Sequence, residues 1–376
     1  RSRHRALTAV IGTAFGVGVS VGAVVPLLSL NLEQRGFDAA EIGINAAMFP
    51  LGAVAFSFLV PRIVAWLGIF RAIIASVTVT ALLMLAFPAI DSYAAWCVIR
   101  LVIGCVGVVH WIASETWINM LARDESRSRV MAIYATVMAG GFVGGPIMLS
   151  LTGIEGWIPF IAVAAASLFA LVPVLLIRSV PPALHGKMDA NVFGIMRKVP
   201  LVMAAAMVAG FVDASLFTLI PVYQVRAGHA EQLAVLSLSV FMAGNLLLQY
   251  PLGWIADHTS RRLAAIVTAA IIVAGAIAYP LMLPAMGPPF WLMMFVWGGV
   301  SWGMYTLGLA LLGERFQPSQ LAAANAAFVM MYEVGSITGP VVSGAALDQW
   351  PALGLPIAVG IVAALFIVIA AVSRQR

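Results

Sequence analysis

The sequence predicts an all-α membrane protein whose twelve transmembrane helices form two pseudo-symmetric six-helix bundles. Of the 376 residues, 62% are hydrophobic and only 9% are charged, whereas about a quarter of the residues in soluble domains are charged. The apolar runs approach or exceed the roughly 20 residues that a helix needs to cross the hydrocarbon, and they are too long for the strands of an outer-membrane barrel. A diverged internal repeat relates the two halves.

Twelve apolar runs give the expected helices. They lie near Ala6–Leu30, Ile42–Val60, Ala72–Phe87, Ala94–Met120, Val130–Leu151, Pro159–Ile177, Leu201–Tyr223, Leu233–Leu252, Ala264–Leu283, Phe290–Leu312, Leu321–Ala345 and Leu353–Val372. Arginines precede the first run, as they do in a secretory signal. This run is longer than the apolar part of a signal, however, and no convincing small-residue cleavage site follows it. We therefore interpret it as the first transmembrane helix.

The basic residues predict how the helices are oriented, because Lys and Arg concentrate in cytoplasmic loops. With both termini in the cytoplasm, all 20 basic residues fall on that side except Arg35 and Arg226, which lie outside, and Arg100, which lies within a helix. The net charge of +5 therefore reflects topology, and no domain for binding nucleic acid is present. We expect a multi-pass, monomeric protein of a bacterial inner membrane.

One segment is long enough to divide the chain into domains. Loops are short everywhere except at residues 178–200, which contain Pro181, Pro182, Arg197 and Lys198. We expect an N-terminal bundle over residues 1–177, a cytoplasmic linker over 178–200 and a C-terminal bundle over 201–376.

The two halves share a repeated pattern of glycine and proline. The run Gly335–Pro340 mirrors Gly141–Pro146 at an offset of 194 residues, and the same offset places Gly104 on another glycine. Pro26 pairs with Pro221 at an offset of 195. Small residues four apart let helices approach closely in lipid, so we expect Gly104, Gly107, Gly141, Gly145, Pro146, Gly335, Gly339 and Pro340 to shape helix packing.

A loop motif in the second half of the chain resembles the signature of a known family. Residues 253–262 (GWIADHTSRR), which follow the eighth helix, resemble the loop signature of the major facilitator superfamily. In the equivalent loop of the first half, 61–71, Pro61 takes the leading glycine position and Ala65 the aspartate position. The resemblance implies that Gly253, Asp257, Arg261 and Arg262 act as a cytoplasmic gate, with Asp257 pairing with an arginine or accepting bonds from helix ends.

Helices 4 and 5 carry further similarity to this family. Arg100-x3-Gly104-x2-Gly107 resembles its helix-4 motif, and Gly141-x3-Gly145-Pro146 resembles the helix-5 motif of its proton-driven exporters. The resemblance covers the whole chain. It implies a major facilitator fold and secondary active transport of a small organic solute or drug-like compound, coupled to protons, with export favoured.

Ionisable residues at membrane depth are costly and are functional candidates by default. Arg100 offers five hydrogen-bond donors, so it can hold an anion, partner a carboxylate or serve as a structural hub. Glu115 lies near the cytoplasmic end of the same helix, and we expect it to form a salt-bridged gate with the arginines of the next loop, including Arg129. Asp213 and Glu333 lie midway along helices 7 and 11. Each can bind a proton or a cationic substrate, or form a fixed hydrogen bond.

Aromatic residues supply candidate substrate contacts. Trp111, Tyr305 and Tyr332 can stack on an organic ligand, although such residues often serve as interfacial anchors or in packing. His110, beside Trp111, can shuttle protons, but a packed and hydrogen-bonded histidine is the favoured interpretation.

Two alternative functions remain open. One is proton-linked or facilitated import of a sugar, a carboxylate or copper, the last suggested by the thioether pair Met203 and Met207. The other is a membrane sensor or partner protein that transports nothing. No phosphate-binding loop or nucleophile motif appears in a supporting context, so we expect neither an enzyme nor a cofactor.

Overall fold

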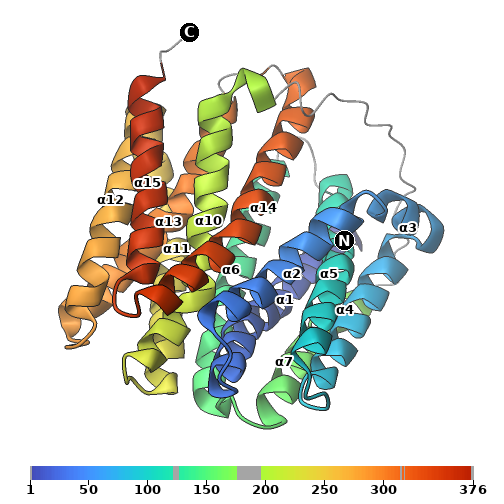
Figure 1. Ribbon diagram of the computed structural model, residues 1–376. Coiled ribbons are helices and arrows are strands. Elements are labelled where there is room, and N and C mark those ends of the chain that lie inside the picture. The colour runs from blue at the N-terminus through green and yellow to red at the C-terminus, as the bar shows by residue number, and fades with distance from the viewer. Residues whose placement is uncertain (1, 122–126, 176–195, 314–315, 317, 374–376) are drawn as a thin grey trace. The chain divides into compact units, whose positions relative to one another are not determined.

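The computed structural model (Figure 1) describes residues 2–121, 127–175, 196–313, 316 and 318–373, and every regular element in them is a helix. Twelve helical stretches among these residues are long and apolar enough to cross a membrane. The predicted class and number of spans are therefore confirmed.

The helices agree closely with the expected runs. They are α1 (Ser2–Gln34), α2 (Ala39–Ser57), α3 (Val60–Leu67), α4 (Ile69–Ala86), α5 (Tyr93–Leu121), α6 (Arg127–Thr152), α7 (Ile158–Phe169), α8 (Val172–Leu175), α10 (Pro200–Arg226), α11 (Glu231–His258), α12 (Arg261–Met282), α13 (Pro288–Gly313), α14 (Pro318–Gln349) and α15 (Gly354–Val372).

The short helix α3 differs from the expectation, because all of its residues except Val60 were assigned to a loop. Pro61 occupies its first turn, where the missing N–H of proline costs nothing and its fixed φ suits a helix. Val60 and Val64, one turn apart, are both buried. Burial of one face explains why these eight residues are helical.

The chain divides into two compact units. The first comprises Arg1–Asn31 and Met48–Lys187, and the second comprises Leu32–Ala47 and Met188–Arg376. The second unit thus contains the segment where α1 ends and α2 begins, in addition to the helices from α10 onward. Both α1 and α2 continue without a break from one unit into the other.

Helices α1 and α6 pack backbone to backbone in the first unit. A methyl group built on Gly18 would lie 2.4 Å from the carbonyl oxygen of Met138, and one on Gly141 would lie 2.3 Å from that of Phe15. Real side-chain carbons do not approach so closely, so glycine is required at both positions.

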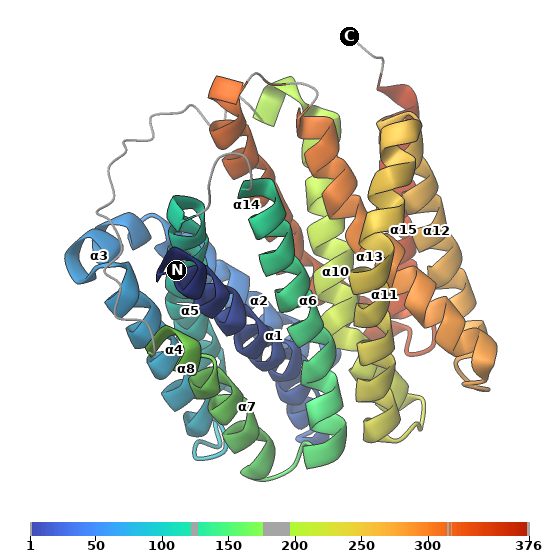
Figure 2. The same cartoon turned by 180° about the vertical axis from the view of Figure 1, so that it is seen from behind.

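Helices α10 and α14 repeat this crossing in the second unit, where they run side by side in both views (Figures 1 and 2). A methyl group on Gly210 would lie 1.9 Å from the carbonyl oxygen of Tyr332, and one on Gly335 would lie 2.1 Å from that of Met207.

The matched crossings fix the register of the repeat. Gly18 corresponds to Gly210, an offset of 192, while Gly141 corresponds to Gly335, the expected offset of 194. At an offset of 192, Pro26 corresponds to Thr218, so the expected pairing of Pro26 with Pro221 is wrong by three residues. The two prolines thus lie inside α1 and α10 at positions that the repeat does not match.

Candidate functional site

Asp213 lies midway along α10 and is only 2% exposed. The hydroxyl of Tyr332 donates a long hydrogen bond of 3.5 Å to its Oδ2. Its Oδ1 is buried and has no hydrogen-bond partner among the described residues. Burying an ionised carboxylate without partners is costly, so this position favours a bound proton or cation.

Aromatic rings pack around Tyr332, the hydrogen-bond partner of Asp213. Tyr332 meets Tyr305 of α13 edge to face with centroids 5.1 Å apart, and Tyr305 meets Phe328 in the same way at 5.2 Å. Asp213, Glu333 and Tyr305 are all close enough to interact electrostatically with the Tyr332 hydroxyl. The structure therefore brings together four of the predicted residues, which we call the Asp213 cluster: Asp213, Tyr305, Tyr332 and Glu333.

The close crossing of α10 and α14 positions this cluster. Gly210 lies against the backbone of Tyr332, and Asp213 follows on α10 by about one turn. The absence of a side chain at Gly210 thus lets the carboxyl group approach the Tyr332 side chain. In the described part of this unit, neither Asp213 nor Glu333 pairs with a lysine or an arginine.

Arg100 and Trp111 lie on α5 in the first unit. Arg100 is 3% exposed and Trp111 is 41% exposed. The offset of 194 that relates α6 to α14 also places Trp111 on Tyr305, so the two repeats carry an aromatic residue at the same place. Whether Arg100 partners a carboxylate stays a prediction.

Glu115 lies close enough to the side chain of Trp111, one turn earlier on α5, to interact with it. The expected partners of Glu115 lie in the loop that ends at Arg129, and the side chains of that loop are outside the described residues. The salt-bridged gate therefore stays a prediction. The contact between Glu115 and Trp111 was not predicted from the sequence.

His110 departs from its expected role. It is 4% exposed, as a packed histidine should be, but neither ring nitrogen has a hydrogen-bond partner among the described residues. The hydroxyl of Ser114, one turn further along α5, is also buried and without a partner in that part of the chain. The expected hydrogen bonding of His110 is thus not met there.

The arginines of the loop signature bind helix ends. Arg261 donates a 2.9 Å hydrogen bond to the carbonyl oxygen of Ala310 in α13. Arg262 donates to the carbonyl oxygens of Ala370 and Ala371 at the end of α15. The last carbonyl groups of a helix lack internal partners, so both arginines fasten α12 to neighbouring helices. The side chain of Asp257 is outside the described residues, and Gly253, near the end of α11, has open space around it.

The remaining predicted packing residues also lie at helix crossings. A methyl group on Gly104 would lie 2.1 Å from the carbonyl oxygen of Phe49, whereas one on Gly107 would make only an ordinary contact of 3.5 Å with the Phe49 ring. Gly145 approaches α1 at Ala23, and Gly339 approaches α10 at the carbonyl of Phe211. Pro146 and Pro340 lie inside α6 and α14.

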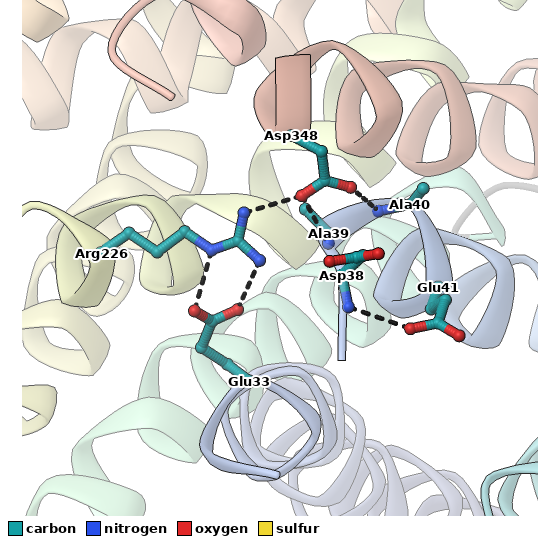
Figure 3. A network of polar contacts seen from close by, with 7 residues as sticks. All are labelled: Glu33, Asp38, Ala39, Ala40, Glu41, Arg226 and Asp348. Atoms are coloured by element: carbon teal, nitrogen blue, oxygen red, sulfur yellow. Dashed lines mark hydrogen bonds and ion pairs between the residues drawn. The ribbon is translucent and has the colours of Figure 1, made fainter. Parts of the chain in front are cut away.

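A second polar site, which we call the Arg226 cluster, joins Glu33, Arg226 and Asp348 in the second unit (Figure 3). Arg226, the last residue of α10, donates two parallel hydrogen bonds of 2.8 and 2.9 Å to the carboxylate of Glu33. Its third bond, of 2.8 Å, goes to Oδ1 of Asp348 near the end of α14. Such bidentate, charge-assisted pairs are the strongest of the ordinary protein hydrogen bonds.

Asp348 also caps the start of α2. Its two oxygens accept hydrogen bonds from the backbone N–H groups of Ala39 and Ala40, at 2.9 and 2.8 Å. Glu41 accepts a hydrogen bond of 3.0 Å from the backbone N–H of Asp38, which is one of the two hydrogen bonds of a capping box. The segment Leu32–Ala47 is thereby fastened to the helices that follow the linker.

Most of this cluster was not predicted from the sequence. Arg226 was interpreted as a marker of topology, and neither Glu33 nor Asp348 was a candidate site residue. The one available signal was the pair Asp38 and Glu41, whose spacing is that of a capping box and marks the start of α2. Ala39 and Asp348 are 309 residues apart in the sequence, so their contact could not be predicted without the structure.

Two related bundles of membrane-crossing helices, with carboxyl groups held inside one of them, are the architecture of solute carriers. Residues 10–307 match the family described as the Major Facilitator Superfamily. The chain belongs to this superfamily, so it is a multi-pass membrane transporter and not an enzyme. The resemblance noted in its motifs is confirmed.

Relatives and solved structures agree with this assignment. The chain is 27% identical to the MFS-type transporter YfkF of Bacillus subtilis over 338 residues, 87% of this chain and 85% of the relative. It is 23% identical to the MFS-type transporter YcaD of Shigella flexneri serotype 5b, over 86% and 84% of the two chains.

Solved transporters share the fold. A bacterial homologue of the human lysosomal transporter Spinster has a TM-score of 0.78 at 16% identity, covering 99% of this chain and 96% of the other. The nucleoside transporter NupG has 0.76 at 15%, covering 98% and 97%. A D-xylose-proton symporter has 0.74 at 15%, covering 98% and 96%.

Proposed function

We propose that this protein is a secondary active transporter that moves a small organic solute or drug-like compound by alternating access, coupled to protons, with export favoured. It acts as a monomer in a bacterial inner membrane, with both termini in the cytoplasm. The observation that carries the proposal is the buried Asp213, whose Oδ1 has no partner in the described part of the protein.

A carboxyl group of this kind can couple transport to protons. Burial favours the protonated form, and exposure to water or the arrival of a cation favours the ionised form. A conformational cycle that alternates these surroundings binds and releases one proton per turn. Glu333, which is half-buried on α14, gives the cluster a second carboxyl group.

The arginine contacts supply the two gates in this proposal. With the termini in the cytoplasm, Arg226 ends α10 on the outer side, so its cluster holds Leu32–Ala47 against α10 and α14 on that side. Arg261 and Arg262 then lie on the cytoplasmic side, where they bind the ends of α13 and α15.

A second candidate function, uptake of an uncharged polar solute, is favoured by one observation. Gln249 donates a 2.9 Å hydrogen bond to Asn245 and accepts one of 2.7 Å from Thr306, whose side chain is exposed. Amide and hydroxyl groups in a row suit a solute rich in hydroxyl groups. Two of the structures with this fold are a nucleoside transporter and a D-xylose-proton symporter.

Proton flux into proteoliposomes containing a trapped pH dye tests both candidates. Organic cations, organic anions, nucleosides and pentoses are added in turn, with Asp213→Asn beside the parent protein. Flux that one solute class triggers and that Asp213→Asn abolishes supports the proposal. Flux that is equal in both proteins removes Asp213 from coupling. Labelled solute that enters without proton movement identifies a facilitator, and no movement of any solute supports a sensor or partner protein.

A further inference from the structure

The short helix α3 lies between two membrane-crossing helices but cannot cross the membrane itself. The stretches Ala39–Ser57 and Ile69–Ala86, on either side of it, are long and apolar enough to span a membrane. The eight residues of α3, Val60–Leu67, extend only about 12 Å, whereas the hydrocarbon is about 30 Å thick. In both views α3 lies at one end of α4 (Figures 1 and 2). Because both neighbouring stretches span the membrane, α3 lies at the membrane surface.

One face of α3 is fixed to the first unit. Val60 and Val64, one turn apart, are both buried. They belong to a hydrophobic cluster that also contains Val109, Ala113 and Trp117 of α5. Burial of this face holds α3 in place and leaves its opposite face to point outward.

The outward face carries large apolar side chains together with a positive charge. Trp66 is 83% exposed, and Phe58, in the turn just before the helix, is 72% exposed. Arg62 is also exposed, and it lies four residues before Trp66, so the two side chains share one face. Arg71, in the first turn of α4, is exposed as well. Tryptophan is enriched at the boundary between a membrane and water.

The charge of this part of the chain is entirely positive. Between Glu41 and Asp91 the sequence contains two charged residues, Arg62 and Arg71, and no acidic residue. Nothing within this stretch therefore balances either charge. Basic and aromatic residues on the outward face of a short helix are typical of helices that lie in the membrane interface, where anionic lipids attract them.

We propose that α3 is a membrane-surface helix that binds anionic phospholipids. Arg62 and Arg71 contact the phosphate groups of the lipid headgroups. Trp66 and Phe58 enter the interface beside them, because an aromatic ring at this depth keeps its apolar body out of water. Anionic phospholipid is thus a partner of the first unit.

The two positions at which loop 61–71 departs from the family signature both lie in this helix. Pro61 occupies its first turn. Ala65 is exposed beside Trp66, and an aspartate at this position would place a negative charge against the phospholipid headgroups. The inference goes beyond the proposed transport, and it stands whichever solute the protein moves.

Hydrogen–deuterium exchange of α3 in nanodiscs tests the inference. The protein is placed in bilayers of phosphatidylcholine alone or of phosphatidylcholine mixed with phosphatidylglycerol. An anionic surface strengthens the attachment of a nearby arginine by about fivefold, so the amides of Val60–Leu67 should exchange about fivefold more slowly, or slower still, in the mixed bilayer. High salt should remove the difference, because it screens the headgroup charges.

Exposed positions allow variants that leave the packed face unchanged. Arg62→Gln and Arg71→Gln should each lose about fivefold of the slowing in the mixed bilayer, and both should match the parent protein in phosphatidylcholine alone. Ala65→Asp should also reduce the slowing, whereas Ala65→Asn, of the same size and without charge, should keep it. Arg35→Gln, which removes an exposed arginine after α1, should keep the full difference.

Quenching of a fluorescent label identifies the bilayer as the partner. A label on Ala65→Cys, in a chain that also carries Cys97→Ser and Cys105→Ser, should be quenched by brominated phosphatidylglycerol in the mixed bilayer. Trp66→Gln should reduce this quenching, because it removes the largest apolar contact with the interface. Glycerol phosphate dissolved beside a phosphatidylcholine bilayer should leave the exchange of α3 unchanged, since it offers the charge without the interface.

Three outcomes would overturn the inference. Equal exchange of α3 in the two bilayers would show that the arginines do not recognise anionic lipid. Slow exchange in both bilayers without quenching would show that another segment of the chain or a second copy covers α3. Slowing by dissolved glycerol phosphate would identify a site for a soluble anion instead.

Discussion

Exchanging Arg226 for glutamine should loosen the segment Leu32–Ala47 from α10 and α14, with which it shares the second unit. When this segment detaches, the bonds between Arg226 and Glu33 must break, whereas the bond between Arg226 and Asp348 joins α10 to α14 and can persist. The variant therefore weakens the attachment of this segment by the free energy of one bidentate ion pair, that between Arg226 and Glu33. Its two side chains are 23% and 16% exposed, so solvent screens the pair only in part.

The magnitude follows from those two charge-assisted bonds. At about 1.5 kcal/mol each they sum to roughly 3 kcal/mol, and partial exposure lowers this to about 2 kcal/mol. That energy corresponds to roughly 30-fold in an equilibrium constant. Hydrogen–deuterium exchange read by mass spectrometry should show the backbone amides of Ala39 and Ala40 exchanging about 30-fold faster in Arg226→Gln.

A double-mutant cycle tests whether Glu33 is the partner responsible. Glu33→Gln should accelerate the same amides by a similar factor, and the double variant should add little more, because both changes remove one interaction. Arg62→Gln, which alters an exposed arginine on α3, serves as the control. Unchanged exchange in Arg226→Gln, or fully additive effects, would refute the reasoning.

Three further changes test other parts of the structure. Gly210→Ala should lower the free energy of unfolding by about 1–3 kcal/mol or more, because the added methyl group forces α10 away from α14. Gly107→Ala, whose methyl group would make only an ordinary contact at 3.5 Å, should lower it far less. Equal melting temperatures of the two variants in detergent would contradict this expectation. His110→Phe should raise the melting temperature, since it removes two unpartnered buried nitrogens that cost about 1–3 kcal/mol; a lower value would reveal a bound ligand or water. Arg262→Gln should speed amide exchange at the end of α15 by several-fold, because about 1 kcal/mol of carbonyl bonding is lost, and an unaltered rate there would count against that role.

The twelve spans were predictable because hydrocarbon thickness imposes a minimum length that apolar composition reports directly. The register of the repeat was predictable only in part. Gly141 and Gly335 aligned correctly because close backbone contact demands glycine at both places. Pro26 and Pro221 aligned by coincidence, since a proline can bend a helix at many depths and nothing ties it to one neighbour.

The members of the candidate site were predictable as single residues, but their grouping was not. Burial cost marks Asp213 and Glu333 as unusual wherever they point. Tyr332 lies beside Asp213 because α10 and α14 approach closely. Gly210 permits this approach, but a glycine in the sequence does not by itself predict which helix will pack against it. The Arg226 cluster was harder still, because its charged members lie at helix ends, where such residues are ordinary.

A second acidic residue is available to cap the N-terminus of α2. Asp348 now accepts hydrogen bonds from Ala39 and Ala40, but Asp38 immediately before them is a residue type that commonly serves as a helix N-cap. If α14 withdraws its carboxylate, the carboxylate of Asp38 can accept hydrogen bonds from the N–H groups of Ala40 and Glu41, the second and third residues of the helix. The helix would then leave intact, exchanging one acidic partner for another without unwinding its first turn. A joint that releases in this way can open and close many times with no cost in refolding.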